Sequence, residues 1–161
     1  MPQILKKLNP VSRDVLSASV EFCHEKSNFF VDLEHYVFCG LQNSDADFEP
    51  ILKYYDIDTT TVLKQLDAAV DRRITGGRQH PAALSPHLLM CLERAWHISS
   101  LELELPFICT SSILLSIIDY DTLRGVMLDS CPLLLRIPRI QFRKDLPQLT
   151  VINGQRYDLS A

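Results

Sequence analysis

The sequence lacks the usual signatures of catalysis. It has neither a G-x-x-x-x-G-K-[ST] phosphate-binding loop nor a G-x-S-x-G nucleophile motif. Its histidines and cysteines show no H-x-x-x-H, H-E-x-x-H or C-x-x-C spacing. Cys23 and His24 are neighbours, and so would point about 100° apart on a helix. We therefore predict no catalytic, cofactor-binding or metal-binding residue. A stand-alone enzyme using cysteine or histidine is the disfavoured alternative.

Long apolar runs and an excess of positive charge are also absent. Apolar runs such as 113–118 fall far short of the roughly 20 residues that span a bilayer. Lys6 and Lys7 are not followed by the apolar stretch of a signal peptide. The net charge of −4 provides no electrostatic footprint for nucleic acid. We expect neither a membrane nor a nucleic-acid partner.

What the sequence does contain fits one folded domain. Its 161 residues are 47% hydrophobic, which is enough for a real core and argues against disorder. The five cysteines are an odd number and mostly lie beside apolar residues. Buried, reduced thiols in a cytosolic protein are the simplest interpretation.

A supersecondary unit occurs twice in the sequence. Leu8-Asn9-Pro10 returns about 76 residues further along as Leu84-Ser85-Pro86, and Leu16 returns as Leu92. The stretch 31–38 is echoed by 108–115, after a shift of one residue. Asn-Pro and Ser-Pro each combine a helix N-cap with a proline at the first helical position. The pattern predicts a duplicated helical unit that buries its apolar face against its copy.

Apolar spacing predicts helices throughout and no convincing strand. The first helix should cover about 10–26, with an apolar stripe of Val11, Val15, Ala18 and Phe22. The remaining expected helices are 33–41 capped by Asp32, 48–55, a helix after Asp58 that ends at 75–77, 86–103, a helix capped by Thr110, and 121–128. The tail 132–149 is less clear, because Pro138 and Pro147 interrupt it. The predicted fold class is all-α.

Taken together, these motifs resemble the N-terminal domain of the Clp family of AAA+ unfoldases. The resemblance covers about residues 4–150 and is carried by Leu8-Asn9-Pro10, Leu33-Glu34-His35, Leu84-Ser85-Pro86 and the helix containing Ile113. The stretches 92–103 and 146–150 look most like ClpV, the unfoldase of type VI secretion. One departure is Ser112, because the second repeat of the family often carries a histidine there.

The resemblance implies a specific organisation. Two four-helix units with pseudo-twofold symmetry would form a domain over 1–150, with repeat one at 8–75 and repeat two at 84–150. A short amphipathic helix at 2–8 would precede them, and 151–161 would be a linker or frayed end. ATP and Mg would belong only to the AAA+ modules of a longer parent. The isolated domain is expected to be a monomer, the parent a hexamer, and both cytoplasmic in a bacterium.

The resemblance also implies a function in recognition. A ClpV N-domain binds an N-terminal helix of the large sheath subunit, TssC or VipB, in a hydrophobic groove, so that contracted sheath is disassembled and recycled. The alternative is the N-domain of a general ClpB-, ClpA- or ClpC-like unfoldase that binds unfolded segments or an adaptor protein. In both cases the chain itself would have no enzymatic activity.

The groove is expected where the short first helix meets the start of the second repeat. Its candidate residues are Ile4, Leu5, Leu8, Leu84, His87, Leu88 and Leu92. Other roles stay open for some of them, since Leu84 and Leu89 have the spacing of a hydrophobic staple and Leu92 lies deep in the apolar stripe. The basic residues at 136–144 are either a solvated helix face or a contact for an acidic neighbouring domain.

Overall fold

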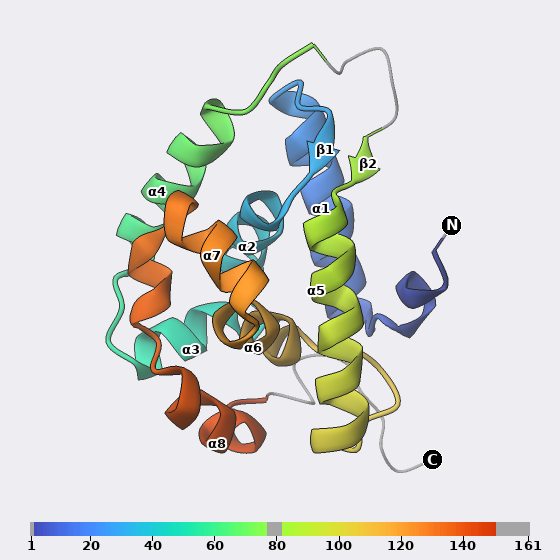
Figure 1. Ribbon diagram of the computed structural model, residues 1–161, viewed down its shortest axis with the longest axis vertical. Helices are drawn as coiled ribbons and strands as arrows, with labels where there is room; N and C mark the ends of the chain where they lie inside the picture. The colour runs from blue at the N-terminus through green and yellow to red at the C-terminus, as the bar shows by residue number, and fades with distance from the viewer. Residues whose placement is uncertain (1, 77–81, 151–161) are drawn as a thin grey trace.

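Four helices from each half of the chain pack together in the computed structural model, which describes residues 2–76 and 82–150 (Figure 1). The first half contains α1 (Pro10–Glu25), α2 (Leu33–Leu41), α3 (Phe48–Tyr54) and α4 (Thr59–Asp71). The second half contains α5 (Pro86–His97), α6 (Thr110–Asp119), α7 (Asp121–Ser130) and α8 (Arg139–Leu149). The all-α prediction is confirmed. The tail 151–161 and the centre of the connector lie outside the described residues.

Short elements complete the chain. A single helical turn, η1 (Gln3–Lys7), precedes α1, and η4 (Pro132–Arg136) links α7 to α8. The prediction that the chain has no strands was wrong in one detail. The segments β1 (Phe30–Val31) and β2 (Ala83–Leu84) form a parallel pair of two residues each. A pair this short leaves no alternation in the sequence by which to recognise it.

The capped helix starts are confirmed for the two repeats. The side-chain oxygen of Asn9 accepts a hydrogen bond from the Ser12 amide at 2.9 Å, and Ser85 Oγ accepts one from the Leu88 amide at 3.0 Å. Thr110 does not cap α6 as expected, because it is the first helical residue and its hydroxyl donates to Asp47 instead, at 3.2 Å. The helix α4 also ends earlier than expected, at Asp71.

The two halves are interlocked by a reciprocal exchange of backbone hydrogen bonds. The Ser85 amide, before α5, donates to the Val31 carbonyl before α2, at 2.9 Å. The Asn9 amide, before α1, donates to the Ile108 carbonyl before α6, at 3.0 Å. The first helix of each half therefore starts against the segment that leads into the second helix of the other half.

A π-helical turn, η3 (Ile98–Glu102), extends α5 and accounts for the one-residue shift between the repeats. Each first helix leads to a residue in the left-handed region, Ser27 with φ 57 and Glu104 with φ 54. The distance from the starting proline to that residue is one position longer in the second half, from 86 to 104 against 10 to 27. A π turn accommodates one extra residue in a helix, so the insertion lies within 98–102.

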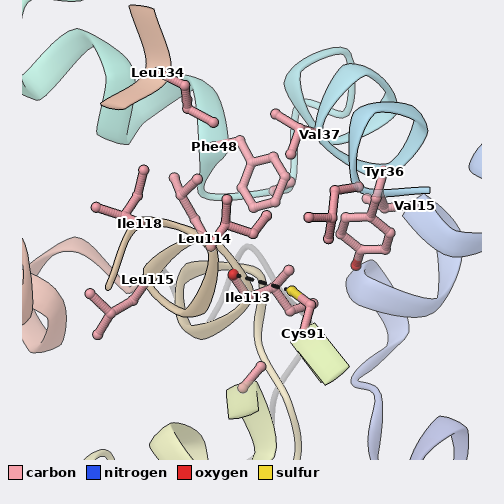
Figure 2. Close-up of a cluster of buried hydrophobic side chains, with 14 of the residues drawn as sticks. Val15, Tyr36, Val37, Phe48, Cys91, Ile113, Leu114, Leu115, Ile118 and Leu134 are labelled. Atoms are coloured by element: carbon pink, nitrogen blue, oxygen red, sulfur yellow. Dashed lines mark hydrogen bonds between the residues drawn. The ribbon is translucent and has the colours of Figure 1, made fainter. Parts of the chain in front are cut away.

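One continuous hydrophobic core joins both halves (Figure 2). Phe48 from the first half lies beside Leu114 of α6, and its ring centroid is 6.1 Å from that of Tyr36; all three side chains are fully buried. The Cys91 thiol donates to the Ile113 carbonyl at 3.7 Å, and burial raises the pKa of this thiol to about 12. All five cysteines are buried and form no disulfide, as expected for buried, reduced thiols.

Candidate partner-binding groove

An apolar hollow of about 450 Å³ lies between η1 and α1. Its lining consists of Leu5, Lys6, Leu8, Arg13, Leu16 and Ser17. Leu5 is half-buried, whereas Leu8 and Leu16 are almost completely buried and form the deeper part of the lining. We call this hollow, with these six lining residues, the N-terminal groove. Its depth and apolar lining suit the inserted side chains of a partner helix.

The turn η1 is held firmly as one wall of the N-terminal groove. It packs against α5, and the Lys7 ammonium lies 4.8 Å from the centre of the Trp96 ring. The Ile108 amide donates to the Lys7 carbonyl at 2.7 Å. Arg13 Nη2 reaches back from α1 to the Leu8 carbonyl at 3.1 Å. A helical turn of five residues is not stable on its own, so these contacts determine the position of η1 beside the groove.

The structure separates the residues predicted from sequence into three groups. Leu5 and Leu8 line the N-terminal groove. Ile4, Leu84 and His87 are half-buried, and none of them lines it. Leu88 and Leu92 are 0% exposed and belong to the core. The contact between η1 and α5, where the groove was expected, is packed together, and the hollow lies on the α1 side of η1.

Four residues of the N-terminal groove were not among the predicted set: Lys6, Arg13, Leu16 and Ser17. The predicted stripe of α1 included Ala18, which is exposed, and left out Leu16, which is buried. Leu16, a large apolar residue outside the assumed stripe, was therefore the signal in the sequence from which this wall of the groove could have been predicted. It was missed because one helix offers two overlapping apolar stripes, and the sequence does not decide between them.

Two of the four basic residues predicted at 136–144, Arg139 and Arg143 on α8, form ion pairs within the chain. Arg139 Nε lies 3.1 Å from Asp119 and Arg143 Nη2 lies 2.7 Å from it, while Arg143 also pairs with Glu102. Although burial raises the pKa of Asp119, hydrogen bonds from the two guanidinium groups outweigh it and lower that pKa. These pairs connect α8 to the end of α6 and to η3, so these two of the four basic residues serve contacts within the chain.

A buried polar cluster surrounds the start of α2. His35 Nδ1 accepts from the Asp32 amide at 2.9 Å, which leaves Nε2–H to donate to Asn28 Oδ1 at 3.0 Å. Glu34 is fully buried, where it accepts hydrogen bonds from Arg73 and Ser130. Both ring nitrogens of His35 are engaged within the fold, so the cluster serves a structural role.

At the matching position of the second repeat, Ser112 forms a smaller buried network. Its hydroxyl lies 2.6 Å from Ser99 Oγ and donates to the Cys109 carbonyl at 2.8 Å. Among residues 2–76 and 82–150, no three potential metal ligands gather into one group. Within the same ranges no helix is both long and apolar enough to cross a membrane.

Comparison with known sequences places the chain beside Clp proteins. No family model matches it. The AAA+ ATPase ClpV1 of Pseudomonas aeruginosa is 30% identical over 121 residues, covering 75% of this chain and 13% of the relative. The chaperone protein ClpB of Yersinia enterocolitica is 25% identical over 135 residues, covering 84% and 15%. The chain thus spans 13% to 15% of the length of the curated relatives it matches.

Solved structures agree on the fold. The N-domain of ClpV from Vibrio cholerae matches with a TM-score of 0.76 at 22% identity, over 99% of this chain and 92% of that one. A ClpV N-domain in complex with a VipB peptide matches with a TM-score of 0.71 at 24% identity, over 93% and 92%. A structure from work on ClpV, the TssB–TssC sheath and HsiE gives 0.85 at 24% identity, over 91% and 90%.

The fold is that of Clp N-terminal domains, as the sequence motifs predicted. Among Clp N-terminal domains the chain resembles those of ClpV, both in sequence and in the solved structures that it matches.

Proposed function

We propose that this chain is the substrate-recognition domain of a ClpV-type AAA+ unfoldase of type VI secretion. In this proposal the N-terminal groove binds the N-terminal helix of the large sheath subunit, TssC or VipB. The observation that carries it is an apolar hollow on a fold whose solved relatives include a ClpV N-domain with a VipB peptide. A match to a structure described by a type VI SciI peptide points the same way, with a TM-score of 0.79.

The chemistry of the groove suits an amphipathic helix. Such a helix presents apolar side chains at i, i+3, i+4 and i+7, which can enter between Leu5 on η1 and Leu16 on α1. Each aliphatic anchor that becomes fully buried contributes about 1.5–3 kcal/mol. The peptide would be disordered when free and would become helical on binding. The domain would supply recognition alone, with no bond made or broken.

The test is a calorimetric titration of the chain with an N-terminal peptide of a VipB-type sheath subunit. Leu5→Asp places a carboxylate on the wall of the groove, and we expect it to weaken binding at least tenfold. The matched control is Leu128→Asp, which makes the same change on α7 at a residue that is 58% exposed and outside the groove. Circular dichroism should show helix gained on binding to the wild-type chain.

Equal affinities for wild type and folded Leu5→Asp would reject the N-terminal groove as the binding site. Leu88 is unsuitable for this purpose, because it is fully buried and an aspartate there would unfold the chain. Absence of any binding by the wild-type chain would reject sheath recognition itself.

Several wider properties follow from the proposal. The parent protein would use ATP and Mg in AAA+ modules outside this sequence, assemble as a hexamer and act in the bacterial cytoplasm to recycle contracted sheath. The domain on its own would be a monomer without enzymatic activity. Gel filtration and an ATPase assay of the chain test the last two statements directly.

A second candidate is the N-domain of a general ClpB-like unfoldase. The match to ClpB favours it, as do three exposed apolar side chains around a smaller hollow of about 160 Å³: Phe29, Phe30 and Ile74. Binding of a permanently unfolded model protein as tight as binding of the sheath peptide would support this alternative, and a clear preference for the sheath peptide would exclude it.

A further inference from the structure

We infer that the N-terminal groove selects partner helices that carry acidic side chains beside their apolar stripe. The inference deepens the proposed function and rests on it, since it concerns which helices enter the same groove. Apolar contacts alone would admit many amphipathic segments. The charges at the edge of the groove add a second requirement, which concerns the residues that flank the apolar stripe.

The groove contains two cations and no carboxylate. Lys6 on η1 and Arg13 on α1 line it together with three leucines and Ser17. Both cations are exposed, and neither has a carboxylate within ion-pair distance in the part of the chain that the structure describes. This positive edge occurs on a chain whose net charge is −4.

Another hollow of the molecule differs from the N-terminal groove in this respect. Arg143 also lines a hollow, of about 190 Å³, but Glu102 and Asp119 line the same hollow and pair with it. That site carries its own counter-ions and has little to offer a charged partner. The N-terminal groove lacks them, so an incoming carboxylate would meet two free cations.

Arg13 is also held in position for such a contact. One of its terminal nitrogens, Nη2, donates to the Leu8 carbonyl at 3.1 Å, which fixes the guanidinium at the edge of the groove. Its other donors stay free to hold a carboxylate, and a pre-positioned guanidinium loses less rotamer entropy when it does so. Lys6 lies on the opposite wall, so acidic residues on either flank of the apolar stripe would find a partner.

The probe is a designed amphipathic peptide about 16 residues long, with one apolar stripe and flanking positions that are all Glu, all Gln or all Lys. Fluorescence anisotropy measures its binding to the chain at low and high salt. We expect the Glu peptide to bind roughly tenfold tighter than the Gln peptide at low salt, and the Lys peptide to bind weakest. The advantage should shrink at about 1 M salt, where screening acts within roughly 3 Å.

Charge-reversal variants locate the effect. Lys6→Glu breaks no ion pair within residues 2–76 and 82–150, and Arg13→Glu removes the anchored guanidinium. Each variant should reduce the preference for the Glu peptide, and the double variant should reverse it. Arg136→Glu makes the same change in net charge at an exposed residue that does not line the groove, and should leave the preference intact.

Equal binding of all three peptides, unaffected by the variants at Lys6 and Arg13, would overturn charge selection while leaving the groove as the binding site. Failure of every peptide to bind, together with failure of the sheath peptide, would overturn the proposed function as well. The same loss of preference in Arg136→Glu would show that net charge alone matters, and would also overturn the inference.

Discussion

His35 is a buried, uncharged side chain at the start of α2. Both ring nitrogens have partners within the fold, and the backbone amide of Asp32 needs the unprotonated Nδ1 as its acceptor. Protonation would turn that acceptor into a donor facing another donor. Burial is the main reason that the pKa of His35 is lowered to about 4, with the charge of Arg73 adding to it and Asp32 opposing it.

The stability of the chain should consequently fall as the pH drops below 6.5. The unfolded chain takes up a proton at the ordinary pKa of 6.5, whereas the folded chain resists protonation down to about 4. The contribution of His35 is therefore complete above pH 6.5 and decreases below it, by about 2 kcal/mol at pH 5. Urea unfolding at intervals from pH 7.5 to 5 measures this loss.

The exposed His97 provides the control for this pH dependence. His97→Gln should keep the full decrease in stability between pH 6.5 and 5. A His35→Gln variant that still folds should lose most of it, at lower overall stability. A wild-type free energy of unfolding that stays constant from pH 6.5 to 5 would contradict the assignment of a neutral, hydrogen-bonded His35.

At the scale of the elements, α1 and the continuous helix formed by α5 and η3 are related copies that differ in length by one residue. Before residue 98 the repeats match at a separation of 76, as from Pro10 to Pro86, and beyond the π turn they match at 77, as from Ser27 to Glu104. A helix can absorb an extra residue as a π turn, in which one backbone hydrogen bond spans an additional position. The Ser100 hydroxyl donates to the Trp96 carbonyl at 2.7 Å, inside this turn.

Deletion of Ser100 should therefore leave the fold intact. The deletion would convert the π turn into regular α-helix and give α5 together with η3 the same length as α1, so residues on both sides would keep their faces. We expect a loss of less than about 2 kcal/mol in the free energy of unfolding and unchanged helix content. Chemical denaturation and far-UV circular dichroism of the deletion variant measure both quantities.

Deletion of Ala18 is the matched comparison. Ala18 is exposed on α1, which has no π turn, so the deletion rotates the rest of the helix by about 100° and carries the buried Cys23 out of the core. This variant should be unfolded or lose well over 3 kcal/mol. If the two deletions were equally damaging, the π turn would not mark the position of the inserted residue.

Most elements were predictable from sequence because they carry strong local signals. The Asn9-Pro10 and Ser85-Pro86 starts determine two helices by capping, and the duplication was visible from them. Thr110 shows the limit of prediction from local sequence. It was expected to cap its own helix, but its hydroxyl donates to Asp47, which lies 63 positions earlier. The pairing of β1 with β2 was hidden for the same reason, because it depends on a contact between the halves.

The site was predictable only in part, since a groove depends on how elements pack together. Leu5 and Leu8, which line the N-terminal groove, were among the predicted residues because an isolated amphipathic turn must dock on something. Leu88 and Leu92 have the same apolar character in the sequence, yet lie in the core. Periodicity indicates that a side chain leaves water. Which surface covers it, or whether a partner does, is decided by contacts between distant elements.

For the whole molecule, the core and the backbone ladder make the two halves interdependent. α2 packs against α7, and α3 packs against α6, so each half covers apolar side chains of the other. Leu8 of the first half forms a backbone bridge with Ile108 of the second half, and Val31 of the first half pairs with Leu84 of the second half. A separated half would expose its share of the core and leave one side of each exchange unsatisfied.

Neither half should therefore fold alone. Fragments 1–76 and 82–161 would each bury too little apolar surface to offset the conformational entropy of their chains, so each should give the circular dichroism and narrow NMR dispersion of an unfolded polypeptide. Mixing them should restore helix content, because the reciprocal contacts can form between separate chains.

The intact chain should unfold in one transition with equal calorimetric and van't Hoff enthalpies. A well-dispersed NMR spectrum from either fragment, or two resolved thermal transitions of the intact chain, would mean that the repeats are independent units and that their interlocking adds little to stability.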